Sequence, residues 1–152
     1  MEPACRANPH ALRPQREIVL SSTASDSHTW NLVYLQLVLE ELGHHVVNLG
    51  ACVPNELLVA ECEACQPDLV VLSTVNGHGY QDGLRAISAL RASPRLAGLP
   101  VIIGGKLGTA GVDAERSARL LEAGFDGVFV DEPAGLRAFR AFVAALPVGV
   151  LS

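Results

Sequence analysis

Short apolar runs alternate along this chain with longer stretches in which apolar residues recur at spacings of three and four. The short runs predict strands at residues 17–22, 45–49, 69–73, 100–104 and 127–130. The longer stretches predict helices at residues 30–42, 54–66, 81–92, 113–123 and 133–146. Gly43 and Gly124 stand where two of these helices should stop, and Pro54 stands where another should open. The pattern therefore predicts five strands, each followed by a helix.

Strict alternation of strands and helices with short connections indicates a parallel sheet with helices on both faces. The run at residues 69–73 is apolar almost throughout, which is typical of a central strand buried on both faces. We therefore predict an α/β fold, a flavodoxin-like (Rossmann-like), doubly wound, five-stranded parallel sheet. The domain is expected to span residues 17–146, between a disordered N-terminal extension at residues 1–16 and a C-terminal tail at residues 147–152.

The composition narrows the classes of function. The net charge is −5 and the sequence has no basic run, so we expect no binding to nucleic acid. Apolar stretches stay well below the ~20 residues needed to cross a membrane. Residues 1–16 are rich in proline and arginine and have no apolar centre, so no signal peptide is predicted. These features favour a cytoplasmic protein without a membrane partner.

Three loops with unusual chemistry follow strands of the predicted sheet. Ligands of doubly wound sheets bind beyond the carboxyl ends of the strands. The candidate binding residues are Ser25, Asp26, Ser27, His28 and Thr29 after the first strand, Ser73, Thr74, Val75 and Gly77 after the third, and Gly104, Gly105, Lys106, Leu107 and Gly108 after the fourth. Because parallel strands end at the same edge of a sheet, we expect these loops to converge.

Asp26 and His28 lie two positions apart in the first of these loops. A carboxylate there can accept a hydrogen bond from one imidazole nitrogen, which fixes the tautomer and leaves the other nitrogen able to bind a metal. A single histidine without Cys, Asp or Glu at ligand spacing does not make a zinc site. It can supply one axial ligand to a metal that carries its own macrocycle. A plain structural hydrogen bond between the two residues is the alternative.

The other two loops are open to two interpretations. Their glycines allow a bulky ligand to approach the backbone closely, but glycine is also common in turns that bind nothing. Ser73 could hydrogen-bond a buried ring nitrogen of a ligand, or it could cap the next turn. Lys106 could neutralise a phosphate, or it could be a solvated surface lysine.

Taken together in their order along the chain, these motifs resemble the signatures of cobalamin-binding domains. The run at residues 25–28 matches the start of the Asp-x-His-x-x-Gly signature, residues 73–75 resemble the Ser-x-Leu motif, and Gly104-Gly105 resembles the Gly-Gly motif. Their order and separation, and the connecting segments at residues 43–50 and 54–57, are similar to those of the small subunit of glutamate mutase (methylaspartate mutase). The resemblance covers about residues 17–146.

This resemblance implies a role for each motif. His28 is expected to displace the nucleotide base of cobalamin and to bind cobalt from below, with Asp26 hydrogen-bonded to it. The displaced tail is expected to enter a slot between the sheet and the helices, where Ser73 bonds its base and residues 104–108 line it. The family's cofactor is adenosylcobalamin, and a separate, large barrel-type subunit binds the substrate. In the isomerisation of glutamate to 3-methylaspartate, the small chain then supplies binding and orientation and no catalytic residue.

Two positions depart from the family pattern. Asn31 stands where the first signature has its glycine, which adds a side chain near the tail slot, and Val75 replaces a leucine. A different corrinoid enzyme and a cobalamin sensor stay open as alternatives. A receiver domain is disfavoured because no aspartate ends the third strand, and a flavodoxin because the later loops lack aromatic residues to stack a flavin.

Overall fold

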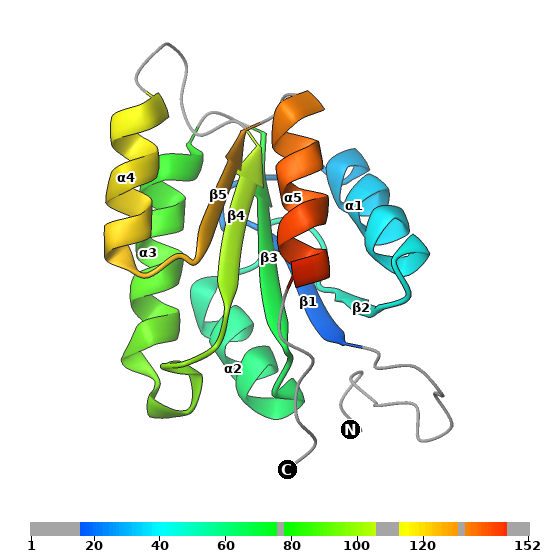
Figure 1. Cartoon of the computed structure of the whole chain (residues 1–152). Coiled ribbons are helices and arrows are strands. Elements are labelled where there is room, and N and C mark those ends of the chain that lie inside the picture. The colour runs from blue at the N-terminus through cyan, green and yellow to red at the C-terminus, as the bar shows by residue number, and fades with distance from the viewer. Residues whose placement is uncertain (1–15, 76–77, 106–112, 131–132, 146–152) are drawn as a thin grey trace.

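Figure 1 shows the computed structural model of the chain, which describes residues 16–75, 78–105, 113–130 and 133–145. In these ranges the strands are β1 (Glu17–Ser22), β2 (His45–Asn48), β3 (Leu69–Thr74), β4 (Val101–Gly105) and β5 (Gly127–Val130). The helices are α1 (Trp30–Glu41), α2 (Asn55–Cys65), α3 (Gly79–Ala92), α4 (Asp113–Ala123) and α5 (Pro133–Ala145), with one 3₁₀ turn, η1 (Pro94–Leu96). Each predicted strand and helix is confirmed, and its ends lie within two residues of the predicted positions. The expected terminal tail at residues 147–152, and the extension up to residue 15, lie outside the described residues.

The strands form one sheet in the order β2-β1-β3-β4-β5, and every neighbouring pair is parallel. This is the predicted flavodoxin-like, doubly wound topology. The chain leaves β1 toward β2 on one side and returns to β3 on the other, so the switch point lies between β1 and β3. The carboxyl ends of β1, β3 and β4 are level, because Ser22 of β1 is paired with Ser73 of β3, and Thr74 of β3 with Gly105 of β4. The loops that carry the candidate residues therefore leave the sheet at one edge.

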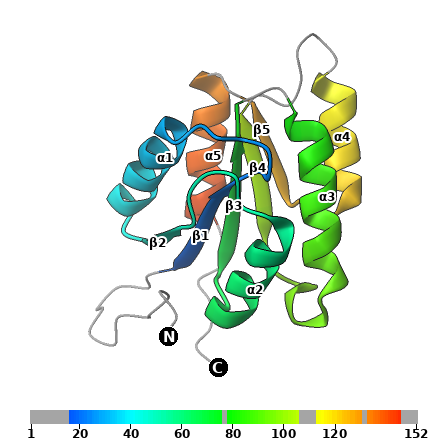
Figure 2. The same cartoon turned by 180° about the vertical axis from the view of Figure 1, so that it is seen from behind.

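Helices cover both faces of the sheet (Figures 1 and 2). Alternate strand residues face opposite layers, and the burial pattern follows this period. The layer with α1 and α5 encloses Ile18, Leu20, Leu69, Val71, Ile102, Leu32, Leu39, Phe139 and Val143. The layer with α2, α3 and α4 encloses Val19, Val70, Leu72, Val101, Ile103, Leu58, Ile87, Leu90 and Leu120. All six residues of β3 are buried, which confirms it as a central strand.

Helix ends follow the sequence signals, with one correction. Gly43 and Gly124 adopt φ angles of +92° and +129° just beyond α1 and α4, which confirms the predicted stops. Pro54 was expected at the first helical position, but it is the N-cap of α2, with φ −62° and ψ 148°. The extended ψ places the proline outside the helix, and Asn55 is the first helical residue.

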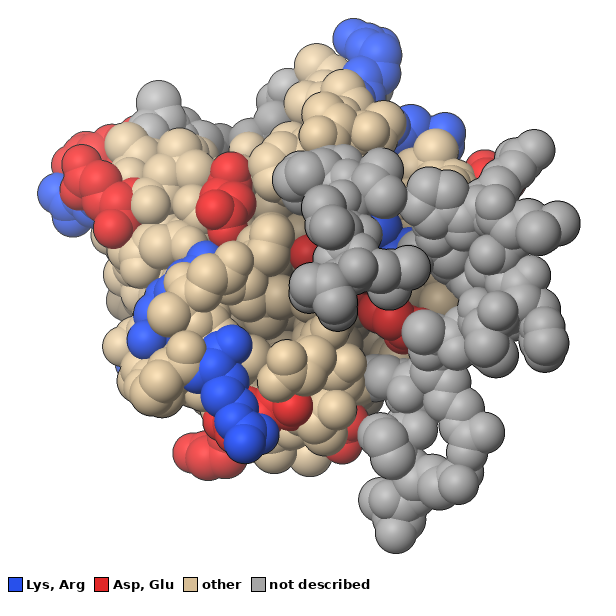
Figure 3. All heavy atoms as spheres, turned by 60° about the horizontal axis from the view of Figure 1, so that its bottom comes forward, with Lys and Arg blue, Asp and Glu red and all other residues tan. Residues whose placement is uncertain are grey.

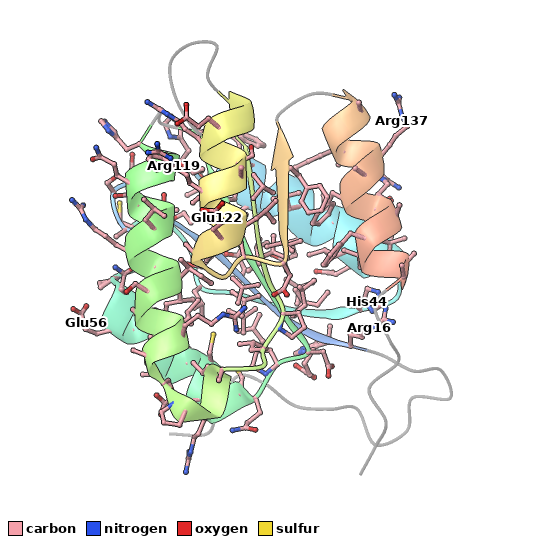
Figure 4. All side chains as sticks on the ribbon, turned by 60° about the vertical axis from the view of Figure 1, so that its left-hand side comes forward. Arg16, His44, Glu56, Arg119, Glu122 and Arg137 are labelled. Carbon is pink, nitrogen blue, oxygen red and sulfur yellow. The ribbon has the colours of Figure 1, made fainter. Side chains whose placement is uncertain are left out.

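The amino edge of the sheet is closed by Arg16, which the sequence analysis assigned to the disordered extension. Its side chain is 9% exposed, and its Nη1 donates a hydrogen bond of 2.9 Å to the carbonyl of Val143 in α5. Its backbone N–H donates to Nδ1 of the buried His44 at 3.4 Å (Figure 4). Arg16 thus ties the start of β1 to α5 and belongs to the folded part of the chain.

His44 makes stability depend on pH. Burial, followed by the charge of Arg16, lowers the pKa of His44 below its ordinary 6.5, although Asp68 opposes this shift. The unfolded chain therefore binds the proton more tightly, so this contribution to stability is present above pH 6.5 and is lost as the pH falls below it. We expect the free energy of unfolding in urea to decrease between pH 7.5 and 5.5, and to decrease less in His44→Gln. An identical decrease in both proteins would exclude His44 as its source.

Among the described residues, no helix is both long enough and apolar enough to cross a bilayer. Figure 3 views the molecule from the amino edge of the sheet. On the part of this face that is not grey, acidic and basic side chains are interspersed among neutral ones. This visible surface therefore carries no large field of one sign.

Candidate cofactor-binding site

Asp26 is the centre of the loop between β1 and α1. Its side chain is fully buried, and Oδ1 accepts hydrogen bonds from the backbone N–H of His28 at 2.9 Å and from His28 Nδ1 at 2.7 Å. Its other oxygen, Oδ2, accepts one from the backbone N–H of Val75 at 2.6 Å. The expected Asp26–His28 hydrogen bond is therefore present. The same carboxylate also joins the loops that follow β1 and β3, which lie 49 residues apart in sequence.

These contacts keep Asp26 ionised. Burial raises the pKa of Asp26, but hydrogen bonds from the N–H groups of Val75 and His28 and from the His28 ring outweigh it, and the pKa falls below its ordinary value. An ionised carboxylate only accepts hydrogen bonds, so the proton of a neutral His28 ring resides on Nδ1. In the described part of the chain nothing is hydrogen-bonded to Nε2, and the His28 side chain is 57% exposed. The unprotonated Nε2 is therefore available to an external ligand.

A second carboxylate, which the sequence analysis missed, holds the other end of this loop. Asp82 in the first turn of α3 is 8% exposed, and its Oδ2 accepts hydrogen bonds from the hydroxyl of Ser25 and, at 3.3 Å, from the Ser25 backbone. An acidic residue in a first helical turn is the only sequence signal for this contact. The Ser25 hydroxyl is thus engaged within the protein. Ser27 and Thr29 are exposed, and the Thr29 side chain makes no capping bond to α1.

A cavity of about 400 Å³ opens beside this loop, between α1, α5 and the sheet. Its walls are mainly apolar, and Phe129 and Phe139 meet there edge to face with ring centroids 5.9 Å apart. The side chains of Asn31, Ser73 and Tyr34 supply its polar groups, and Asn31 Nδ2 donates a hydrogen bond to Ser73 Oγ. Val75 also lines the cavity, and its backbone N–H donates to Asp26. Val75 therefore connects the cavity wall to the carboxylate that holds His28.

The structure brings four of the other candidate residues to this cavity, namely Ser73, Val75, Gly104 and Gly105. Thr74 is fully buried and is not part of the cavity wall. Gly77, Lys106, Leu107 and Gly108 lie outside the described residues. The aromatic and aliphatic wall residues were not predicted, because apolar side chains of α1, β5 and α5 look like ordinary core in sequence.

Gly104 and Gly105 are glycines for different reasons. Gly105 has φ +115°, and a Cβ there would lie 1.8 Å from the carbonyl oxygen of Thr74, so the fold itself requires glycine. At Gly104 the nearest atom to an added Cβ is the Phe129 carbonyl oxygen at 3.4 Å, an ordinary contact. Gly104 lines the cavity and shares its sheet face with Ile102. Of these two glycines, Gly104 is the one that the protein's own packing does not explain.

We expect Gly104→Ala to fold normally and to bind a ligand of this cavity about 10-fold more weakly, because one added methyl in a close-packed site costs ~1 kcal/mol or more. Gly105→Ala is the matched comparison, and it should lower the thermal midpoint instead. Thermal unfolding and a ligand titration of both variants separate the two roles. Equal ligand affinity in Gly104→Ala and the unaltered protein would contradict the first.

Within the described ranges, no group of three or more His, Cys, Asp or Glu residues could hold a metal ion. The arrangement instead offers one nitrogen ligand, oriented by a buried carboxylate, next to a largely apolar cavity. It suits a metal that brings its remaining ligands with it.

Comparison with known proteins identifies the family. The family model of the B12 binding domain matches residues 16–140. Glutamate mutase sigma subunit 1 of Haloarcula marismortui is 30% identical over 117 residues, which are 75% of this chain and 75% of that protein. The glutamate mutase sigma subunit of Fusobacterium nucleatum is 28% identical over 116 residues, which are 76% of this chain and 85% of that protein.

Among solved structures, a cobalamin-binding protein from Desulfitobacterium hafniense has a TM-score of 0.64 and 27% identity over 76% of this chain. The present chain spans about half of that protein, 53% of its length. The fold, the family match and the named relatives all indicate a B12-binding domain. The chain belongs to the family of B12-binding domains.

Proposed function

We propose that this chain is the cobalamin-binding small subunit of an adenosylcobalamin-dependent mutase that converts glutamate to 3-methylaspartate. The observation that carries the proposal is the Asp26–His28 pair, in which a fully buried carboxylate holds a ring that is 57% exposed. The family match supports the cofactor, and the names of the sigma-subunit relatives support the reaction. When bound, adenosylcobalamin supplies a cobalt–carbon bond whose homolysis starts the rearrangement.

The described residues fit this cofactor. His28 Nε2 would supply a nitrogen ligand to the cobalt, and Asp26 would set the tautomer and the orientation of the ring. The cavity beside them would receive the nucleotide tail, because its largely apolar walls suit a flat aromatic base and the side chains of Asn31 and Ser73 could bond the edge of that base. Gly104 keeps the cavity wide at the end of β4. We also propose that Lys106, Leu107 and Gly108 line the nucleotide tail.

We further propose that a large, barrel-type subunit holds the substrate and covers the cofactor. Support comes from α1, whose outer face is apolar where a surface helix is normally polar. Trp30, Val33, Tyr34 and Leu37 are 85, 46, 50 and 58% exposed, and their spacing places them on one stripe of the helix. The stripe begins two residues after His28, at the same edge of the sheet. A partner that meets the cofactor there can bury the stripe too.

A single charged substitution on the α1 stripe tests this partner surface. We expect Leu37→Glu to weaken assembly with the large subunit by about 30-fold, which corresponds to ~2 kcal/mol, the usual threshold of an interface hot spot. Cobalamin binding by the isolated small chain should not change. Leu57→Glu on α2 is the matched control, because Leu57 is 46% exposed and lies in the opposite helical layer. Equal assembly by both variants in a sedimentation or light-scattering titration would contradict the assignment.

The proposed function is tested by titrating the purified chain with adenosylcobalamin. The absorption spectrum should change to that of a base-off cofactor with a histidine ligand, and mutase activity should appear only after the large subunit is added. Failure to bind at saturating cofactor would refute the proposal. Binding without activity beside the large subunit would favour a sensor or a subunit of another corrinoid enzyme.

A further inference from the structure

The amide of Asn31 faces the cavity at the position where the family signature has a glycine. Asn31 is the second residue of α1, and its Nδ2 donates a hydrogen bond to Ser73 Oγ on the central strand β3. Its Oδ1 is buried and has no hydrogen-bond partner in the described part of the chain. Buried acceptors in folded proteins are nearly always paired, so this oxygen calls for a donor. Because Asn31 lines the cavity, an occupant can provide it.

Asn31 and Ser73 together present one donor and one acceptor. The Ser73 side chain is 2% exposed, and its oxygen uses a lone pair to accept from Asn31 Nδ2. The hydroxyl proton of Ser73 therefore stays available for an acceptor on the ligand, next to the unpaired Oδ1. Turning the amide by 180° exchanges the two roles and still leaves one donor and one acceptor. Apart from Tyr34, which is 50% exposed, the remaining lining residues have apolar side chains or are glycines.

This pair discriminates between lower bases by their edges. The dimethylbenzimidazole of cobalamin carries one free ring nitrogen, which accepts a hydrogen bond, and no N–H group. It can satisfy Ser73 but leaves the Asn31 acceptor buried and unpaired, which is costly. An aminopurine such as adenine carries an amino N–H beside a ring nitrogen, so its amino group can donate to Asn31 Oδ1 while its ring nitrogen accepts from the Ser73 hydroxyl. With glycine in place of Asn31, Ser73 would be the only one of the two residues left to bond the base, and the cavity would no longer distinguish the two bases.

On the basis of the proposed function, we propose that Asn31 makes the cavity selective for a corrinoid whose lower base is an aminopurine. Asn31 is a specificity-determining residue of the tail site, acting with Ser73. It touches the base and not the cobalt, so its effect depends on the presence of a nucleotide tail.

The test compares three probes by equilibrium titration, read from the absorption change on His28 ligation. The probes are adenosylcobalamin, its analogue with adenine as the lower base, and adenosylcobinamide, which has no base. The unaltered chain should bind the adenine analogue about 10-fold more tightly than adenosylcobalamin. Asn31→Gly should lose this preference by gaining affinity for adenosylcobalamin, and its affinity for adenosylcobinamide should not change. Asn31→Ala should also lose the preference, and it avoids the backbone freedom that glycine adds to α1.

Equal affinity of the unaltered chain for the two complete corrinoids would overturn the inference, as would an unchanged preference in Asn31→Gly and Asn31→Ala. A matching change in adenosylcobinamide affinity would also overturn it, because Asn31 would then act without the base. If the unaltered chain binds none of the three probes, the proposed function itself fails. Binding of all three without preference refutes the role of Asn31 alone.

Discussion

Replacing His28 with glutamine is expected to leave a folded domain whose bound cobalamin no longer shows the spectrum of a histidine-ligated cofactor. The His28 ring donates a hydrogen bond to the buried Asp26 carboxylate, so its loss should lower the free energy of unfolding by at most about 1.5–3 kcal/mol. The affinity for cobalamin should fall by more than about 100-fold, beyond the 10–100-fold range typical of residues that only orient a metal ligand. Circular dichroism and a spectroscopic titration measure the two effects separately.

The matched control is His45→Gln at the amino edge of the sheet. His45 is also part of a histidine–carboxylate pair, with its Nδ1 2.8 Å from Glu17 Oε2 and its side chain 39% exposed. The same substitution there should leave both the affinity and the spectrum intact. A histidine-type spectrum that persists in His28→Gln would show that cobalt takes its lower ligand from elsewhere.

Asp26→Asn is expected to damage both stability and cofactor binding. The two oxygens of Asp26 accept from Val75 on one side and from His28 on the other, so either orientation of an amide turns its NH₂ group toward an N–H donor. Leaving buried donors unpaired costs about 1–3 kcal/mol, and more where a charge is lost. An amide turned toward Nδ1 also favours the wrong histidine tautomer. We expect affinity for cobalamin to fall by about 10–100-fold.

The pH dependence provides a second readout of Asp26. Because its pKa is lowered in the folded chain, its contribution to stability is present above the ordinary value of 3.8 and is lost as the pH falls through the folded pKa. Asp26→Asn should therefore flatten the acid side of the stability profile measured in urea. Asp68→Asn is the control, since Asp68 accepts from the backbone of Glu17 at 2.8 Å but lies at the opposite edge. Equal cofactor affinity in Asp26→Asn and Asp68→Asn would rule out a special role for Asp26.

Most of the fold was predictable because its signals are local. Apolar periodicity marked each strand and helix, and glycines marked the ends of α1 and α4. The proximity of Asp26 and His28 was also predictable, since they lie two positions apart in one loop. Arg16 and Pro54 were misassigned because their roles depend on contacts with α5 and on backbone angles that composition does not reveal.

What the sequence alone determined is therefore the order of elements, the parallel sheet and the histidine–carboxylate pair. The tertiary structure alone decided which residues from distant segments contact one another around that pair and the cavity. Val75 reaches Asp26 across 49 residues, Asp82 reaches Ser25 across 57, and Asn31 reaches Ser73 across 42. It also distinguished the glycine that the backbone requires, Gly105, from the one that the cavity uses, Gly104. These contacts join segments that meet only when the crossovers bring the carboxyl ends of β1, β3 and β4 to one edge, so no local pattern could encode them.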